Sequence, residues 1–408
     1  MAIEWRPKLP LIDTPLLLAA LALVGIGLLT VYSATSVPGA HQGLWVRQLV
    51  WALIACGVAW VVAGIHYRVY DALAWPLYGI SLLLLALVLV MGTSALGAKR
   101  WLDLGPLHFQ PSELAKVATV LVLARTFDQE KLDLRRFAHW APALAYVLVP
   151  FALVAKEPDL GTSLAFPVIL VVMYFWAGMP PGQLALGLTP VLNAVLFFVT
   201  GTLWWSGGLV LLVLGLVRPR PGTLLLVLLL NTGLAVALPR VWNHLADYQK
   251  QRIETFVNPG NDPYGAGYQV IQSRIAIGSG GFRGTGYLKG TQKALAFLPM
   301  RHTDFIFSVI GEEWGLLGAL TVVLLYAVIV LRGFRLALAA RSGFASLLAV
   351  GVVTAFFYHI MVNLLMTIGW APVTGLPLPL VSYGGTALVA NGIQLGLLQN
   401  VAVRRLEF

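Results

Sequence analysis

Charged residues are scarce in this chain, which has 408 residues of which 11% are charged and 59% are hydrophobic. Soluble globular domains carry about 25% charged residues, so this chain lacks the polar surface that a water-soluble fold needs. Its mean hydropathy of +0.83 points the same way. Apolar runs recur and approach the roughly 20 residues that cross a bilayer as a helix, whereas the alternating segments of outer-membrane barrels do not occur. The composition predicts an all-α polytopic membrane protein.

Cysteine is almost absent, since Cys56 is the only one in the sequence. This excludes an intramolecular disulfide and a cysteine-based metal site. The net charge of +10 does not predict nucleic-acid binding, because the basic residues are scattered through loops. Their placement fits orientation in a membrane and contact with anionic lipid or phosphate. No Ser-His-Asp or metal-ligand spacing occurs, and His302 and His359 are interpreted as packing or hydrogen-bonding residues.

The apolar runs predict the membrane spans. They lie near residues 12–33, 45–65, 72–92, 112–127, 138–155, 162–178, 184–201, 207–217, 223–239, 305–331, 343–368 and 386–402. Because 207–217 is short for a span, 184–217 is predicted to be an extra apolar hairpin added to ten spans. The whole chain, 1–408, is predicted to be one transmembrane domain.

Positive charge predicts the orientation of this domain. Arg and Lys are more frequent in the loops that share a side with the two termini than in the short loops of the opposite side. The positive-inside rule therefore predicts a protein of the cytoplasmic (inner) membrane with both termini in the cytoplasm. The segment 240–304 is then external.

This external segment is far longer than an ordinary loop, since loops beyond about 12–15 residues are usually functional or disordered. Tyr268, Ile271 and Ile275 have helical spacing and predict a short amphipathic helix along the membrane surface. The turn signals of Asn258-Pro259-Gly260 and Asp262-Pro263 place Asp262 on an exposed turn. Asp262 is either an Asx-turn residue that satisfies its own backbone or a general base that faces an outer cavity.

A glycine-rich stretch follows, GSGGFRGTGYLKG at 278–290. Its backbone amides could cradle phosphate oxygens, with Arg283, Lys289 and Lys293 supplying positive charge. It is not a Walker loop, because no Gly-Lys-Ser/Thr follows the glycines. A flexible surface loop explains the glycines equally well.

Ionisable residues also stand at the mouth of the apolar run 112–127. Glu113 and Lys116 lie one helical turn apart, and charged groups at membrane depth tend to pair and to face a cavity. The alternative is an ion pair in which the two charges only stabilise each other and have no further role. Lys99 and Arg100 belong to a basic, aromatic patch at the outer interface, which an ordinary aromatic belt with snorkelling anchors would also explain.

Three further outer segments carry candidate residues. Asp159 lies in the charged turn KEPDLGT, which a tight hairpin alone would also need. Asp304 precedes the adjacent carboxylates Glu312 and Glu313, an arrangement that is unusual near a membrane unless the carboxylates face water or a base. Ser382 lies in PLPLVSYGG, which we interpret as irregular backbone lining a cavity.

Together and in this order, these segments resemble the SEDS family (shape, elongation, division and sporulation), whose members include RodA and FtsW. The resemblance is carried by QPSELAK, KEPDLGTSL, DPYGAGYQVIQSRIAIGSGG, LPMRHTDFIFSVIGEEWG and PLPLVSYGGT. It covers nearly the whole chain, and the residues from Lys289 to Lys293 favour the RodA branch. The chain departs from the family in its extra apolar stretch at 184–217, since the family usually has ten spans.

The resemblance implies a peptidoglycan glycosyltransferase that polymerises lipid II at the outer face of the membrane, in cell elongation and shape maintenance. It also implies a class B penicillin-binding protein as partner. Asp262 would be the essential acidic residue, and Glu113 and Lys116 would line the central cavity.

Such a reaction has three chemical requirements. A carboxylate must take the proton of the attacking sugar hydroxyl. The pyrophosphate leaving group needs Lys, Arg or a divalent cation, and Mg²⁺ or Mn²⁺ is left open. The polyprenyl chain must stay in the membrane lipid. A flippase or other transporter of lipid-linked precursors is the alternative, although inverted hydropathy repeats are not seen. A non-catalytic scaffold would leave the charged outer residues without a purpose.

Overall fold

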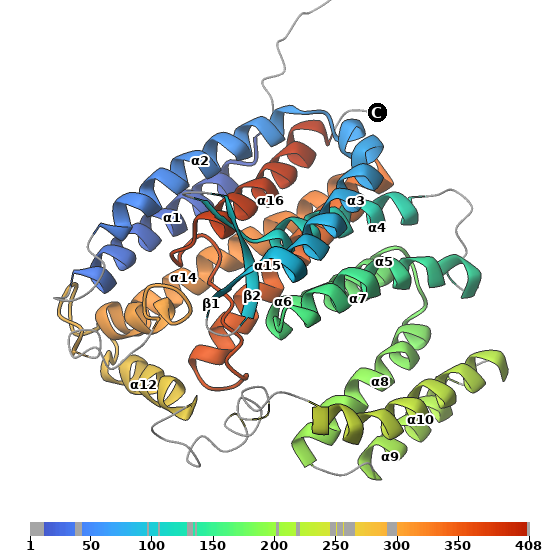
Figure 1. Cartoon of the computed structure of the whole chain (residues 1–408). Helices are drawn as coiled ribbons and strands as arrows, with labels where there is room; N and C mark the ends of the chain where they lie inside the picture. Colours follow the sequence, from blue (N-terminus) through green and yellow to red (C-terminus); the bar gives the residue numbers. More distant parts are fainter. Residues whose placement is uncertain are drawn as a thin grey trace, which may run out of the picture.

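All the predicted apolar runs are helical in the computed structural model of the chain (Figure 1). The structure describes residues 12–36, 43–95, 98–104, 107–128, 134, 137–200, 204–217, 221–244, 250, 256, 266–291 and 300–405. The first helices are α1 (Thr14–Thr35), α2 (Leu44–Gly64), α3 (Tyr67–Met91), α4 (Pro111–Phe127), α5 (Phe137–Lys156), α6 (Leu160–Ser163) and α7 (Ala165–Trp176). The later helices are α8 (Pro181–Thr200), α9 (Trp204–Val217), α10 (Pro221–His244), α12 (Ala266–Ser279), α14 (Ile306–Ala339), α15 (Gly343–Thr367) and α16 (Gly385–Arg404).

Six of the described helices are long and apolar enough to cross a membrane, namely α1, α2, α3, α14, α15 and α16. Shorter apolar helical stretches occur within α5, α6–α7 and α10. Helix α9 has 14 residues, which at 1.5 Å per residue is about 21 Å and less than the roughly 30 Å hydrocarbon core. The prediction of a polytopic all-α membrane protein is confirmed.

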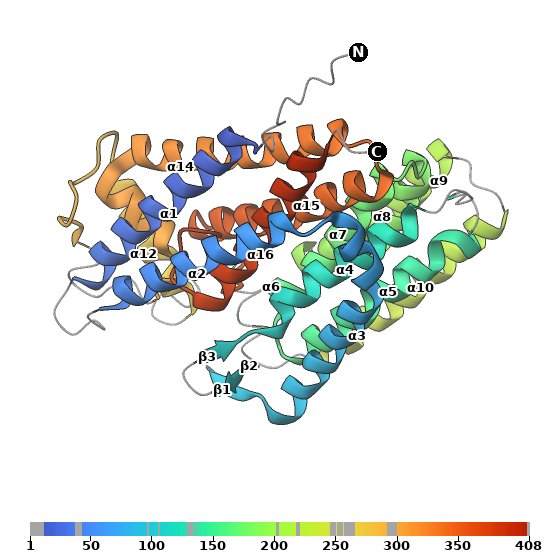
Figure 2. The same ribbon diagram turned by 90° about the horizontal axis from the view of Figure 1, so that it is seen from above.

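Helix α15 lies in the interior of the helix assembly, where it packs against α4, α7, α14 and α16 (Figures 1 and 2). Most of its side chains are buried, whereas α2 and α3 turn large apolar side chains outward, among them Leu53, Trp60 and Leu83. Exposed apolar surface of this extent is unfavourable in water and suits a lipid environment. The outward faces of α2 and α3 are therefore lipid-facing.

Helices α8, α9 and α10 form a group to one side of the other helices (Figure 1). They have a small hydrophobic core of their own, formed by Leu186, Val210 and Val227. Inside it, Asn231 Nδ2 donates to Thr189 Oγ1 at 2.9 Å. Hydrogen bonds of this kind hold helices together where lipid removes the hydrophobic driving force. The predicted extra apolar element at 184–217 corresponds to α8 and α9.

A small antiparallel sheet, which the sequence did not predict, lies between α3 and α4. Its strands β1 (Thr93–Ala95), β2 (Ala98–Leu104) and β3 (Leu107–Phe109) are in the order β1-β2-β3. Strand β2 pairs Leu102 with Phe109 of β3. The basic, aromatic patch of the sequence is thus part of a strand, which carries Arg100 toward the turn between α5 and α6.

Helix α14 is broken at Gly315, whose φ of 64° lies outside the helical region. The break releases backbone groups that must find partners, because an unpaired buried amide or carbonyl is costly. The glycine-rich loop after α12 supplies them: Leu316 N donates to Gly281 O at 2.9 Å, and Thr285 N donates to Glu312 O at 2.9 Å. The loop and the kink therefore stabilise each other.

Candidate functional site

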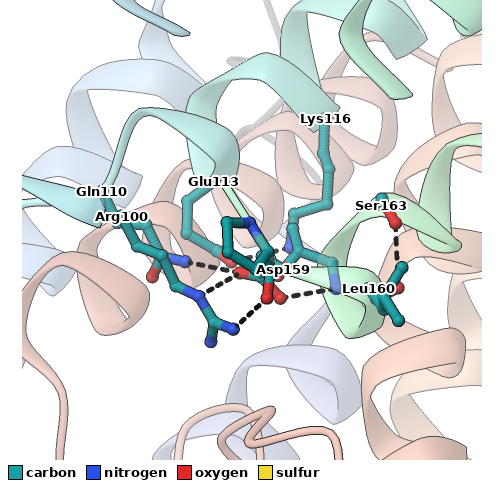
Figure 3. A network of polar contacts seen from close by, with 9 residues as sticks. Arg100, Gln110, Glu113, Lys116, Asp159, Leu160 and Ser163 are labelled. Carbon is teal, nitrogen blue, oxygen red and sulfur yellow. Dashed lines mark hydrogen bonds and ion pairs between the residues drawn. The ribbon is translucent and has the colours of Figure 1, made fainter. Parts of the chain in front are cut away.

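Five polar side chains converge where α4 begins, facing the turn between α5 and α6. Figure 3 shows them as Arg100, Gln110, Glu113, Lys116 and Asp159, and we call them the charged cluster. Pro111 begins α4, as suits the first helical position. Glu113 and Lys116 then lie one turn apart on the same face of the helix. The structure thus joins segments that are separate in the sequence.

Lys116 is the most deeply buried charged residue of the cluster, with 1% of its surface exposed. Its Nζ donates to Glu113 Oε1 at 2.8 Å, and it lies 2.5 Å from Nε2 of His359 on α15. An ammonium group can only donate, so His359 accepts through Nε2 and carries its proton on Nδ1. The predicted Glu113–Lys116 ion pair is confirmed, and His359 is a third member.

A small cavity adjoins this ion pair. Glu113 and His359 line it together with the segment around Ser382, and its volume of about 10 Å³ is close to the room that one water molecule needs. The Ser382 hydroxyl donates to Thr303 O at 2.6 Å, while Gln48 of α2 donates to Ser382 O at 2.9 Å. Ser382 thus lines this small cavity and also holds the irregular segment in place; its role toward a substrate stays a prediction.

Asp159 connects the turn before α6 to the rest of the charged cluster. Its Oδ1 accepts from Thr162 N at 3.1 Å, and its Oδ2 accepts from the Thr162 hydroxyl at 2.8 Å and from Gln110 Nε2 at 3.4 Å. Arg100 Nε lies 3.9 Å from the same Oδ2. Asp159 therefore caps α6 and also binds β2 and α4 to this turn, so the hairpin explanation covers only part of its contacts.

Glu157 is a residue that the sequence reasoning did not select. Its side chain is 0% exposed, and neither carboxyl oxygen has a hydrogen-bond partner in the described part of the chain. Burial, and then the charge of Asp159, raise the pKa of Glu157 to about 8, against the opposing effect of Arg100. Glu157 is therefore mainly protonated at neutral pH. The sequence feature that could have indicated Glu157 is its position two residues before Asp159, which places two carboxyl groups in one short turn.

Replacement of Glu157 by Gln is expected to change how stability depends on pH. Between its ordinary pKa of 4.5 and about 8, the folded protein retains a proton that the unfolded chain releases. Its stability therefore falls as the pH rises through this window and is constant above it. Gln stays neutral, so Glu157→Gln should be more stable than the wild type by on the order of 3 kcal/mol at pH 7.

Thermal unfolding in detergent at pH 5 to 9 measures this effect. The advantage of Glu157→Gln should shrink toward pH 5, while Glu157→Asp, which still ionises, should keep the pH dependence of the wild type. Parallel unfolding curves for wild type and Glu157→Gln across this range would contradict a neutral buried Glu157.

The other predicted residues lie outside this cluster. The backbone oxygen of Asp304 accepts from Asn363 Nδ2 at 2.9 Å, which fastens its turn to α15. Arg283 and Lys289 are exposed in the loop after α12. Lys99 is in β2, but its side chain, together with all of Asp262 and Lys293, lies outside the described residues.

The glycine-rich loop makes close backbone contact with α14. A Cβ on Gly284 would lie 2.1 Å from Glu313 O, and the φ of Gly284 is +79°, so only glycine fits there. The amides of Thr285 and Gly286 donate to carbonyls of α14 and are not directed at a ligand. Close packing against α14 therefore accounts for Gly280, Gly284 and Gly290. A role of Arg283 and Lys289 toward phosphate stays a prediction.

The adjacent carboxylates of α14 also have protein partners. Both oxygens of Glu313 accept from the Ser33 hydroxyl of α1, at 2.6 and 2.8 Å, and Glu312 Oε1 accepts from Thr291 Oγ1 at 3.1 Å. These contacts give the two carboxylates a structural role in joining α1 and the glycine-rich loop to α14.

Within the described residues, no three side chains of His, Cys, Asp or Glu gather in a way that could hold a metal ion. Asp262 is not among these residues, so the structure does not test a divalent cation site that includes it. The basic side chains of the charged cluster are those of Arg100 and Lys116.

Known proteins and one family model match this chain over nearly its whole length. The FtsW/RodA/SpoVE family model, described as cell cycle protein, matches residues 14–205 and 193–407. The chain is 36% identical over 395 residues to the peptidoglycan glycosyltransferase MrdB of Escherichia coli K12, with 97% of this chain and 94% of that protein covered. It is 34% identical to a solved chain from a peptidoglycan synthase complex that coordinates polymerization and crosslinking, with a TM-score of 0.73 and 97% and 99% coverage. The rod shape determining protein RodA of Thermus thermophilus is 29% identical, with a TM-score of 0.66 and 98% and 100% coverage.

Proposed function

The chain belongs to the FtsW/RodA/SpoVE family, and we propose that it is a peptidoglycan glycosyltransferase that polymerises lipid II in cell elongation and shape maintenance. The observation that carries this proposal is the 36% identity with MrdB over 97% of the chain. An alignment of this extent includes both the charged cluster and the segment around Asp262, and it is therefore more than a likeness of fold.

In the proposed reaction, a hydroxyl oxygen of the acceptor sugar forms a bond to the anomeric carbon of the donor. The bond from that carbon to the lipid pyrophosphate breaks, and the leaving group takes the electron pair. Asp262 accepts the proton of the attacking hydroxyl. Positive charge stabilises the pyrophosphate, and Arg100 and Lys116 of the charged cluster are candidates for this role. Lys99, Arg283, Lys289 or a divalent cation are further candidates.

We also propose that the reaction takes place at the outer face of the cytoplasmic membrane, with both termini in the cytoplasm. The distribution of Arg and Lys among the loops supports this orientation. A class B penicillin-binding protein is the proposed partner, because a similar solved chain belongs to a complex that coordinates polymerization and crosslinking.

Purified protein incubated with lipid II is expected to produce glycan strands that a gel separates by length. Lipid II without the protein, and the protein with Asp262→Asn, are the controls and should give none. The transporter alternative makes the opposite prediction: vesicles that contain the protein would move lipid II between leaflets, and no strands would form even with the partner present. That pair of results would replace the proposed function by transport.

A further inference from the structure

An apolar groove of about 490 Å³ lies between α1, α2 and α16. Its α2 wall consists mainly of small residues, among them Ala52, Ala55, Cys56 and Ala59. Helix α16 comes very close to α2 behind them, since a Cβ on Gly392 would lie 2.6 Å from Ala55 O. Small side chains on one helix and close backbone packing to the next leave a furrow along the surface. No residue of the described chain fills it.

The length of the groove fits one hydrocarbon chain. It runs along residues 12–24, which include the first part of α1, and along residues 52–64 of α2. At 1.5 Å per residue this is about 18 Å, close to half of the roughly 30 Å hydrocarbon core. The groove therefore matches in length a single hydrocarbon chain from one leaflet.

One end of the groove carries positive charge. Arg404, which lines that end, is the only charged residue among those that line the groove. Its guanidinium donates to Ala63 O at 2.8 Å and so is fixed at the end of α2. Arg405 follows it in the sequence. Basic residues at a membrane surface attract the phosphates of anionic lipids, so a lipid chain in the groove would have its headgroup at this end.

We propose that this groove binds one acyl chain of an anionic glycerophospholipid, with the lipid phosphate at Arg404, and that the bound chain supports the wall of the charged cluster. The second part follows from Leu380 and Leu388, which line both the groove and the small cavity beside Glu113 and His359. Leu380 has a φ of +67°. Such a backbone is unfavourable for a branched residue and persists only where its surroundings hold it. A chain in the groove fills the space behind Leu380.

Photocrosslinking tests the binding site without regard to enzymatic activity. Phosphatidylglycerol with a diazirine in one acyl chain, added to the purified full-length protein, should label peptides from 52–64 of α2 and 388–404 of α16. Unlabelled phosphatidylglycerol should compete, and undecaprenyl phosphate should compete much less. Labelling confined to other helices would overturn the site, and stronger competition by undecaprenyl phosphate would overturn the identity of the lipid.

A pair of variants on α2 makes the test specific. Cys56→Trp would fill the groove, whereas Val61→Trp adds the same side chain at a position that is 60% exposed and does not line the groove. Displacement of a chain removes the burial of several of its CH₂ groups, so Cys56→Trp should lower labelling by more than about tenfold. Val61→Trp should leave labelling unchanged. Equal labelling of the two variants would refute the proposal.

The support of the cluster is tested separately, and this part alone rests on the proposed function. The rate of glycan synthesis should rise with the phosphatidylglycerol content of the vesicles for the wild type and Val61→Trp but not for Cys56→Trp. The same lipid dependence in Cys56→Trp would refute the coupling. A complete absence of synthesis in the wild type would instead count against the proposed function, because the crosslinking result does not depend on it.

Discussion

Replacement of Asp262 by Asn or Ala is expected to abolish glycan polymerisation while the protein still folds, inserts in the membrane and binds its partner. In the proposed reaction only this carboxylate accepts the proton of the attacking hydroxyl, and general base catalysis contributes about 10²–10⁴-fold to a rate. If Asp262 instead holds a cation, the loss would be similar, since Asn is a poorer ligand than a carboxylate. Folding should survive, because the sequence predicts that Asp262 lies on an exposed turn and surface substitutions usually change stability by no more than about 0.5 kcal/mol.

The measurement is strand synthesis from lipid II by equal amounts of purified protein, with thermal unfolding to confirm the fold. Asp247→Asn is the matched control, since Asp247 is a second aspartate of the segment 240–304 and should be dispensable. If Asp262→Ala polymerises like the wild type, the catalytic assignment is wrong and the transporter alternative becomes the better one. Equal losses in Asp247→Asn and Asp262→Asn would point to the overall charge of the segment and not to a base.

The helices could be predicted because lipid imposes a simple rule. Each span must be a long apolar run whose backbone N–H and C=O groups form hydrogen bonds within the segment. Helix α12 was also predictable, from the spacing of Tyr268, Ile271 and Ile275. The sheet β1–β3 was not, since strands of three residues such as β1 and β3 are too short to show an alternating pattern. The kink at Gly315 escaped prediction because its stability depends on a loop that is distant in the sequence.

Only those contacts of the charged cluster that join residues close together in the sequence could be predicted. Glu113 and Lys116 are three residues apart, and that spacing alone indicates a pair on one helix face. His359 is 243 positions from Lys116, so no local pattern connects the two. Glu157 was missed for another reason: its unusual state comes from burial and from the absence of partners in the described fold, and a sequence does not show burial at a turn.

The Glu113–Lys116–His359 contacts now give a sharper test of the ion pair than single alanine variants would. Loss of one member of a buried pair leaves an uncompensated charge and typically costs about 3–5 kcal/mol. Glu113→Gln or Lys116→Met alone should therefore unfold the protein at clearly lower temperature. The double variant Glu113→Gln/Lys116→Met leaves no buried charge at these positions, and its stability should return near that of the wild type, since neutral replacement of a buried pair is often tolerated.

Activity distinguishes the two explanations of the pair. If Glu113 and Lys116 only stabilise each other, the double variant should polymerise lipid II as the wild type does. We expect instead that it stays inactive, because the proposed reaction needs positive charge beside the leaving pyrophosphate and Lys116 is one of the two basic residues of the charged cluster. The charge-reversed variant Glu113→Lys/Lys116→Glu should also fail, because it places a carboxylate at position 116, where the proposed reaction needs positive charge. Thermal unfolding and strand synthesis on the same preparations decide the question: a double variant that is both stable and fully active would show that the ion pair is structural alone.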